Sequence, residues 1–505
     1  MSAHAVPTDP LQDLVQQWTG RALLERELLG LDAGKRQALE AALAAAASGL
    51  AEIVPAVARE GLGWRCARCG GSAVRHVPCS RCGRWACPFC EECAPLGPAR
   101  GCERLFRFPL PPGWAGPLQP RRPGALPYLP EGTPDPWPRF PFPLTPAQEA
   151  VAERLKEWVL AAGGPESMLL WAACGAGKTE ILLSAAAAVV RAGGRVLVAA
   201  PRREVVRELA PRVRAAVDPV PVAAWYGGSE PARDRPDPRA PLVVATTHQA
   251  LRFYRAFHLV AVDELDAFPF RDHEVLRRAV DRAALPGARR LWVTATPPGW
   301  LRRQVRAPGR KRCGVVFLPA RPHGHPLPEP RFLWDPRLGA WRSLKGWPGK
   351  LVAWLKAGRE RGARLLVFVP TVDLARELVR PLSRILDEEV GALWAGHPRR
   401  DVELERFRQG QVGVLVSTSV LERGVTLPAV DVAVLFPEHP VFDEATLVQM
   451  AGRAGRSLED PHGRVLFAGV RPSWQVVMAA AAIRAMNRRA ARAGLLAGAP
   501  PRMGR

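Results

Sequence analysis

No stretch of the 505-residue sequence is apolar for long enough to span a lipid bilayer, which takes roughly 18 or more consecutive apolar residues. The longest candidates, residues 181–190 and 476–483, are rich in alanine and are better explained as buried helix faces. The first residues include Asp9 and Asp13 and lack the basic, apolar and small-residue regions of a secretory signal. We therefore expect a soluble, cytoplasmic protein.

Acidic residues are scarce relative to basic ones. The chain has 48 Asp and Glu against 71 Lys and Arg, which gives a formal net charge of +23. Such an excess predicts a polyanionic partner, with nucleic acid ahead of an anionic membrane surface. The alternative is an arginine-rich composition without a charged patch. Hydrophobic residues at 48% are typical of a soluble globular protein, and the length predicts roughly two to four domains.

Cysteine is nearly absent outside one segment, because eight of the ten cysteines lie between Cys66 and Cys102. In a cytoplasmic chain, Cys-x-x-Cys pairs predict metal ligands rather than disulfides. Two such pairs complete a tetrahedral, structural Zn²⁺ site. The predicted ligands are Cys66, Cys69, Cys79, Cys82, Cys87, Cys90 and Cys93.

The pairing of these cysteines stays open. Cys66 and Cys69 share an ion with either Cys79 and Cys82 or Cys90 and Cys93, and a second ion would take Cys102 or His76 as its last ligand. Five arginines interleave with the ligands, which suits contact with nucleic acid or only improves solubility. They are Arg65, Arg68, Arg75, Arg81 and Arg84.

Residues 168–190 have the pattern of a phosphate-binding loop: an apolar strand, a glycine-containing turn and a helix that begins with Lys178 and Thr179. Backbone N–H groups of such a turn point at phosphates, and the helix dipole favours their negative charge. Lys178 is expected to contact the β- and γ-phosphates of ATP, and Thr179 to bind Mg²⁺. The residues predicted to bind the nucleotide are Gly175, Ala176, Gly177, Lys178, Thr179, Glu180, Gln148 and Gln449.

Strand-like and helix-like runs alternate from residue 168 to 293 and again after residue 340. This alternation predicts two parallel sheets covered by helices, that is, two RecA-like α/β lobes with a cleft between them, of which only the first has a phosphate loop. The strand candidates are residues 168–173, 195–200, 221–225, 242–246, 258–262 and 290–293, then 364–369, 390–394, 412–417, 431–436 and 464–468. The predicted divisions are a helical segment (1–60, with two or three helices from residue 11), a Cys module (61–106), a Pro-rich linker (107–143), lobe 1 (144–320) and lobe 2 (321–505).

Several polar residues follow the predicted strands, where ligands sit in open α/β sheets. Asp263 is expected to hold Mg²⁺ through water and Glu264 to activate the attacking water, although a solvated acidic turn is the alternative. Thr294 and Thr296 are placed to report the state of the γ-phosphate.

Residues 449–456 read Gln-Met-Ala-Gly-Arg-Ala-Gly-Arg, with Arg453 and Arg456 one helical turn apart. Guanidinium groups supplied by a partner lobe neutralise charge that develops on the γ-phosphate, so hydrolysis would depend on closure of the cleft. A plain basic helix face is the alternative.

The order of Lys178, Asp263, Thr294 and Arg453 resembles that of superfamily 2 helicases, over roughly residues 140–470. The Asp-Glu-Leu-Asp box differs from the boxes that name the RNA-remodelling subfamilies. The resemblance assigns nucleic-acid contacts to Pro201, Arg202, Gly227, Gly228, Thr246, Thr247 and Thr418. It assigns coupling of the nucleotide site to the nucleic-acid site to Thr294, Thr296 and Gly424.

A Cys module ahead of the motor, together with residues 262–270, 321–328 and 449–457, resembles the ComFA family of late competence ATPases. This resemblance implies a cytoplasmic motor, active at the inner face of the cell membrane, that binds ATP, Mg²⁺ and Zn²⁺. It implies that the motor pulls transforming single-stranded DNA through the channel protein ComEC, with ComFC and DprA as partners. One alternative is a replication-restart helicase like PriA, whose Cys-x-x-Cys pairs lie within the helicase region. The other is a zinc-stabilised nucleic-acid-binding scaffold with a vestigial motor.

Overall fold

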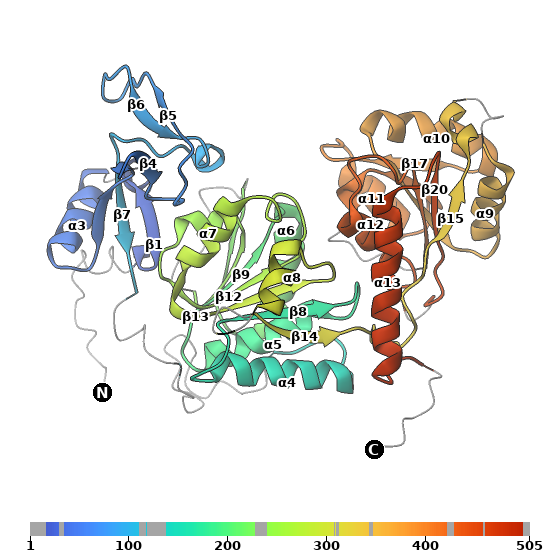
Figure 1. Cartoon of the computed structure of the whole chain (residues 1–505), viewed down its shortest axis with the longest axis horizontal. Coiled ribbons are helices and arrows are strands. Elements are labelled where there is room, and N and C mark those ends of the chain that lie inside the picture. The colour runs from blue at the N-terminus through green and yellow to red at the C-terminus, as the bar shows by residue number, and fades with distance from the viewer. Residues whose placement is uncertain are drawn as a thin grey trace, which may run out of the picture.

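The computed structural model describes residues 17–29, 35–110, 118, 138–227, 240–307, 309, 313–342, 347–421, 429–457 and 460–497. They form an N-terminal unit and two lobes arranged in a row, and each lobe is built on a parallel sheet (Figure 1). The predicted fold class of two RecA-like α/β lobes is therefore confirmed. Among these residues, no helix combines the length and the apolar character needed to pass through a membrane.

Lobe 1 contains a seven-stranded sheet of order β10-β11-β9-β12-β13-β8-β14. Its strands are β8 (Ser167–Ala172), β9 (Val196–Ala200), β10 (Val222–Trp225), β11 (Leu242–Thr246), β12 (Phe257–Asp263), β13 (Ala284–Thr294) and β14 (Gly314–Leu318). Its helices are α4 (Pro146–Leu160), α5 (Lys178–Arg191), α6 (Arg203–Val217), α7 (Glu274–Ala283) and α8 (Gly299–Arg306). Since β12, β13 and β8 are parallel neighbours, the residues that follow these three strands meet at one edge of the sheet.

Lobe 2 contains a six-stranded sheet of order β15-β20-β19-β16-β18-β17. Its strands are β15 (Arg331–Trp334), β16 (Arg364–Phe368), β17 (Val390–Leu393), β18 (Val414–Ser417), β19 (Val430–Leu435) and β20 (Val465–Gly469). Its helices are α9 (Gly349–Glu360), α10 (Val372–Leu386), α11 (Arg400–Arg408), α12 (Glu444–Ala451) and α13 (Trp474–Arg492). The strand predictions missed β14 and β15, which are partly buried edge strands of the two sheets.

Helix α13 lies between the lobes (Figure 1). It packs on α12 of lobe 2, while its Arg489 guanidinium lies 5.2 Å from the ring centroid of Trp171 and 4.6 Å from that of Phe317, both in lobe 1. The helix therefore contacts both lobes at once.

The N-terminal unit corrects the helical prediction for residues 1–60. A three-stranded antiparallel sheet of order β1-β7-β2 forms its base, with β1 (Arg21–Leu24), β2 (Glu52–Pro55) and β7 (Arg104–Phe108). Among the described residues of this segment, the α-helices are α2 (Glu25–Leu29) and α3 (Lys35–Ala47). Strand β1 is buried along its whole length. A strand buried on both faces lacks the alternation of apolar and polar residues that would distinguish it from a buried helix.

The Cys-rich segment is an insertion between β2 and β7. It contains two hairpins, built from β3 (Val57–Glu60) with β4 (Gly63–Cys66) and from β5 (Val74–Val77) with β6 (Cys87–Cys90). Strand β7 returns to the base sheet after this insertion and continues to Phe108, so the predicted boundary at residue 106 falls inside a strand. Most of the predicted linker, residues 111–117 and 119–137, lies outside the described residues.

The N-terminal unit packs on the side of lobe 1 that faces away from lobe 2 (Figure 1). The backbone N–H of Tyr254 donates to the carbonyl of Gly20 over 2.9 Å, and Arg107 lies over the Tyr254 ring at 4.9 Å. From α7, Arg278 donates to the carbonyl of Cys69 over 3.3 Å and Arg282 donates to the carbonyl of Arg68. The N-terminal unit and lobe 1 therefore share an interface that contains backbone and side-chain hydrogen bonds.

Candidate nucleotide site and metal centres

The loop between β8 and α5 has the predicted strand–turn–helix form. Gly175 and Gly177 adopt φ values of 79° and 81°, a left-handed backbone that favours glycine. A Cβ at Gly177 would lie 2.2 Å from the side-chain nitrogen of Gln148, so this position also has no room for a side chain. Lys178 and Thr179 follow in the first turn of α5, where the helix N-terminus favours phosphate.

Gln148 reaches this loop from α4. Thr145 and Gln148 form a capping box at the start of the helix: the Thr145 hydroxyl accepts from the Gln148 N–H, and the Gln148 side-chain carbonyl accepts from the Thr145 N–H over 2.8 Å. The Gln148 amide then donates to the carbonyl of Ala176 over 3.0 Å. Gln148 is therefore fixed against the loop that it was predicted to serve.

The carboxylates at the end of β12 face the loop. Burial and the neighbouring Glu264 raise the pKa of Asp263 to about 6, while the nearby Lys178 opposes the shift. Glu264 adopts a φ of 53°, a conformation in which non-glycine residues are uncommon and which is typical of functional sites. These two carboxylates and Lys178 therefore lie together.

Asp266, the last residue of the box, received no role from the sequence. Its carboxylate accepts from Thr294 over 2.6 Å and from Thr296 over 2.7 Å, and Gln449 of lobe 2 donates to it over 3.4 Å. Asp266 thus joins the ends of β12 and β13 to the opposite lobe. The only sequence signal was a carboxylate and two hydroxyls, each just after a predicted strand.

Lobe 2 contacts the loop through residues 449–456. The Cys174 thiol donates to the Gln449 side chain over 3.3 Å, and a Cβ at Gly452 would lie 2.4 Å from that of Cys174. Burial lowers the pKa of Arg453 to about 9, as does Arg456, while Glu264 and Glu208 oppose the shift. A Cβ at Gly175 would lie 3.2 Å from the Arg456 side chain. Both arginines therefore lie at the lobe 1 site.

The two arginines do not lie on one helix, which corrects the prediction. Helix α12 ends at Ala451, and Gly455 adopts a φ of 59°, a left-handed conformation that a helix does not contain. Arg453 and Arg456 belong to the turns that follow α12.

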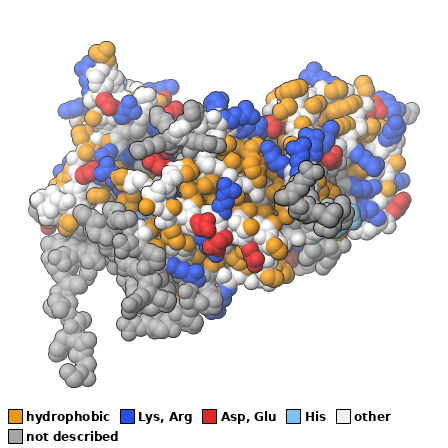
Figure 2. Space-filling model, turned by 60° about the horizontal axis from the view of Figure 1, so that its bottom comes forward, with side chains coloured by type: hydrophobic (Ala, Val, Ile, Leu, Met, Phe, Trp, Pro, Cys, Tyr) orange, Lys and Arg blue, Asp and Glu red, His pale blue; other side chains and the backbone are white. Residues whose placement is uncertain are grey.

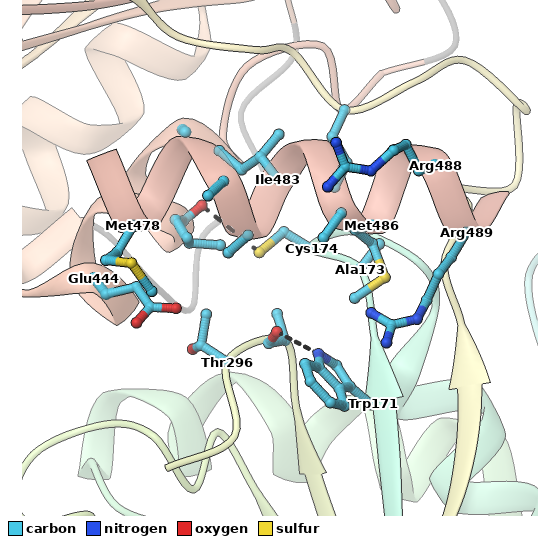
Figure 3. Close-up of a pocket in the computed structure, with 18 of the residues that line it drawn as sticks. Trp171, Ala173, Cys174, Thr296, Glu444, Met478, Ile483, Met486, Arg488 and Arg489 are labelled. Carbon is cyan, nitrogen blue, oxygen red and sulfur yellow. Dashed lines mark hydrogen bonds between the residues drawn. The ribbon is translucent and has the colours of Figure 1, made fainter. Parts of the chain in front are cut away.

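A cavity of about 330 Å³ lies beside the loop, between the lobes and α13. Figure 3 shows Ile483, Met486 and Arg489 of α13 on one side and Trp171 and Thr296 of lobe 1 on the other. The Trp171 indole donates to the carbonyl of Ala295 over 2.9 Å, which fixes its ring in the cavity wall. The loop, the end of β13 and α13 therefore border one space.

The predicted nucleic-acid contacts that the structure describes lie at the carboxyl ends of β9, β10, β11 and β18. Arg202 is half-buried and Gly227 is exposed, so both are accessible, whereas Thr246 and Thr247 are buried. Thr418 is half-buried. Gly228 and Gly424 lie outside the described residues.

The cysteines form two interleaved groups. The first contains Cys66, Cys69, Cys90 and Cys93, and the second contains Cys79, Cys82, Cys87 and Cys102, with the ligand atoms of each group within 4.8 Å of one another. The sulfur atoms of Cys66 and Cys93 are 3.7 Å apart, and those of Cys79 and Cys102 are 3.8 Å apart. Four thiolates around one Zn²⁺ lie about 3.8 Å apart, given Zn–S bonds of about 2.3 Å. Both groups therefore fit a metal ion bound by four sulfurs.

This arrangement resolves the pairing that the sequence left open. Cys102 is the ligand missing from the predicted set, while His76 packs edge-on against Trp64, with ring centroids 5.2 Å apart. The β5–β6 hairpin brings Cys87 back to Cys79 and Cys82, and β7 begins just after Cys102.

Most of the interleaved arginines form ion pairs within the protein. Arg65 pairs with Glu60, Arg68 with Glu27, Arg75 with Glu91, and Arg81 with Glu25 and Glu103. Among the described residues, Arg84 is the member of this set without an ion pair. It precedes Trp85, whose side chain is 87% exposed.

Comparison with known proteins places these features in a class. A model of DEAD/DEAH box helicases matches residues 145–303, and a model of the helicase conserved C-terminal domain matches residues 349–457. With two RecA-like lobes that meet at a phosphate-type loop, the protein is a superfamily 2 helicase-type ATPase. A solved helicase, Mycobacterium smegmatis Lhr bound to ssDNA and AMP-PNP, is similar in fold, with a TM-score of 0.50 and 20% identity over 69% of this chain and 48% of that one.

The N-terminal unit indicates which family of superfamily 2 ATPases the chain belongs to. A model described as the competence protein ComFA N-terminal domain matches residues 8–107. Competence protein ComFA of Bacillus subtilis (strain 168) is 35% identical over 352 residues, 69% of this chain and 73% of that protein. ComFA of Streptococcus pneumoniae (strain R6) is 33% identical over 430 residues, 83% of this chain and 89% of that protein. The chain belongs to the ComFA family of competence proteins.

Proposed function

We propose that this protein is an ATP-driven translocase on single-stranded DNA that serves the uptake of transforming DNA. The observation that carries the proposal is the composite site, in which Glu264 and Gly175 of lobe 1 lie close to Arg453 and Arg456 of lobe 2, respectively. A site divided between two lobes makes hydrolysis depend on their closure, and alternating closure is a means of moving a strand held across both lobes.

The residues of the site have separate roles in ATP hydrolysis. Lys178 and the N–H groups of the 175–179 turn bind the phosphates, and Glu264 orients the attacking water. Arg453 and Arg456 stabilise the negative charge that develops on the transferred phosphoryl group. Thr179 and Asp263 would hold Mg²⁺, which would partly neutralise the charge of the phosphates. The raised pKa of Asp263 fits this role, because a buried carboxylate is stabilised by a cation.

The proposed partner is single-stranded DNA, in keeping with the net charge of +23 and with the Lys and Arg side chains that gather along the upper edge of the face in Figure 2. By family resemblance we extend the proposal to ComFC, DprA and the channel ComEC, and to a cytoplasmic place at the inner face of the cell membrane. We also propose Zn²⁺ as the metal of both cysteine groups, since four thiolates without a carboxylate are its usual structural ligand set.

The test is ATP hydrolysis measured with no nucleic acid, single-stranded DNA, duplex DNA, forked duplex and single-stranded RNA. Strong stimulation by single-stranded DNA alone is the expected result, and stimulation mainly by forked duplex would favour a restart or repair helicase. Lys178→Ala should abolish turnover and leave DNA binding in place. Lys156→Ala is the matched control, because Lys156 is a half-exposed residue of α4 whose ion pair, among the described residues, is with Glu153.

A further inference from the structure

Arg321 lies on the segment that connects the lobes, between the end of β14 and the start of β15. Its side chain is 3% exposed. The Nε atom donates to the carbonyl of Cys174 in lobe 1 over 2.9 Å. The two terminal nitrogens donate to lobe 2, with 2.8 Å to Ala454, 2.9 Å to Gly452 and a further bond to Gly455. One guanidinium therefore binds the phosphate loop and the turns that bear Arg453 and Arg456.

The charge of this group has no carboxylate partner, because Arg321 forms no ion pair with any described residue. The hydrogen bonds of the Arg321 guanidinium all go to backbone carbonyls, and Arg456 lies close enough to repel the guanidinium electrostatically. A buried cation held this way adds positive potential where a bound nucleotide places its phosphates. Phosphate binding therefore favours the arrangement in which all four bonds are made.

A second side chain of the same segment supports the turn. The Nε2 atom of His323 lies 3.2 Å from the carbonyl of Gly455, which Arg321 also contacts. Gly455 is the residue whose left-handed backbone turns the chain toward Arg456. The connecting segment therefore holds this turn at two points.

We propose that Arg321 is a positioning residue for hydrolysis: it fastens the 452–455 turn to the phosphate loop, so that Arg453 and Arg456 face the γ-phosphate when the lobes close. The proposal rests on the nucleotide site proposed above. It needs the planar fork of arginine, because a lysine ammonium in its place would keep the charge but would not bridge carbonyls of both lobes in one plane.

The experiment compares Arg321→Ala and Arg321→Lys with Arg289→Ala in the full-length protein. Arg289 is a matched control, since it is also buried and also donates to carbonyls only, those of Ala161, Gly163 and Pro165, all within lobe 1. For each variant we would measure kcat and KM for ATP with single-stranded DNA, thermal stability, and hydrogen exchange of peptides covering residues 445–457 with and without a non-hydrolysable ATP analogue.

Both Arg321 variants should lose about 10²-fold in kcat, the usual cost of displacing reacting groups by about 1 Å, and should lose the protection of residues 445–457 that the analogue induces. Arg289→Ala should be less stable to heat but keep kcat and that protection. The proposal is overturned if Arg321→Ala keeps wild-type kcat, if Arg321→Lys restores it, or if Arg289→Ala loses protection equally.

Lys178→Ala distinguishes a failure of the Arg321 proposal from a failure of the nucleotide-site proposal on which it rests. If Lys178→Ala hydrolyses ATP at the wild-type rate, the nucleotide site itself is wrong and the role of Arg321 falls with it. If Lys178→Ala is inactive while Arg321→Ala is fully active, only the role of Arg321 is refuted.

Discussion

Gly452→Ala offers a direct measure of how closely the lobes must approach. Gly452 caps α12 with φ −64° and ψ −7°, a backbone that alanine adopts without strain. The added Cβ would lie 2.4 Å from the Cβ of Cys174 and 2.8 Å from its sulfur. Contacting carbon atoms lie about 3.5–4.0 Å apart, so one methyl group forces this contact open by about 1 to 1.5 Å.

Such a displacement moves Arg453 and Arg456 away from the site, and a misplacement of about 1 Å costs ~10²-fold in rate. We expect kcat to fall by about that factor, with little change in thermal stability, because the lobes can separate without unfolding. The assay is ATP hydrolysis with saturating single-stranded DNA, followed by a melting curve.

Gly349→Ala is the control, since Gly349 lies in lobe 2 at the start of α9 with no atom near its missing Cβ, and it should behave as wild type. Cys174→Gly combined with Gly452→Ala should recover part of the lost rate, because it removes the two nearest atoms that the new methyl group meets and leaves the Val448 carbonyl oxygen at 3.2 Å. A Gly452→Ala protein with wild-type kcat would refute the close approach as a requirement of the chemistry.

Four further outcomes are expected. The purified protein should contain two Zn²⁺ per chain by elemental analysis, with one lost in Cys69→Ala and one in Cys82→Ala; a single ion shared by all variants would contradict the two groups. Asp266→Asn should lower kcat roughly ten- to a hundred-fold, because an amide cannot accept from both Thr294 and Thr296 as the carboxylate does, and wild-type kcat would rule out this role. Trp85→Ala should weaken binding of single-stranded DNA by roughly 5- to 150-fold, the range of losing one stacked base, whereas Leu62→Ala, equally exposed but not aromatic, should not; equal affinities for both variants would exclude stacking. The Mg²⁺ concentration for half-maximal hydrolysis should rise as pH falls below about 6, because protons then compete for the Asp263 carboxylate whose pKa is raised; a requirement that is constant between pH 5 and 8 would argue against Asp263 as the Mg²⁺ ligand.

The lobes were largely predictable because their strands are buried on both faces. Residues 242–246, for example, were predicted as a strand and form β11, whose five residues are all buried. The edge strands β14 and β15 are only partly buried, whereas β1 is fully buried but its pattern fits a helix equally well. Pattern alone distinguishes these cases poorly, since it reports burial rather than backbone pairing.

Within the site, the residues with local signals were found and those with distant partners were missed. Lys178 and Asp263 stand at breaks between a strand and a turn, which a sequence shows. Asp266 gains its role from hydroxyls 28 and 30 residues away, and Arg321 from carbonyls up to 147 residues away. Such contacts exist only once the sheet and the lobe interface have formed. Cys102 joined its group in the same way, through the return of the chain to the base sheet.

The bonds from α7 to the first metal knuckle have a mechanical consequence. Arg278 and Arg282, from the helix that follows the Asp263–Asp266 box, donate to the carbonyls of Cys69 and Arg68, so a rotation of lobe 1 would carry the N-terminal unit with it. The β5–β6 hairpin extends from this unit on the side away from lobe 2 (Figure 1). Rotation of lobe 1 about the cleft would therefore sweep the hairpin through a wider arc than the site itself travels, in the manner of a lever arm. Anything bound at the tip would be displaced farther per cycle than the lobes are.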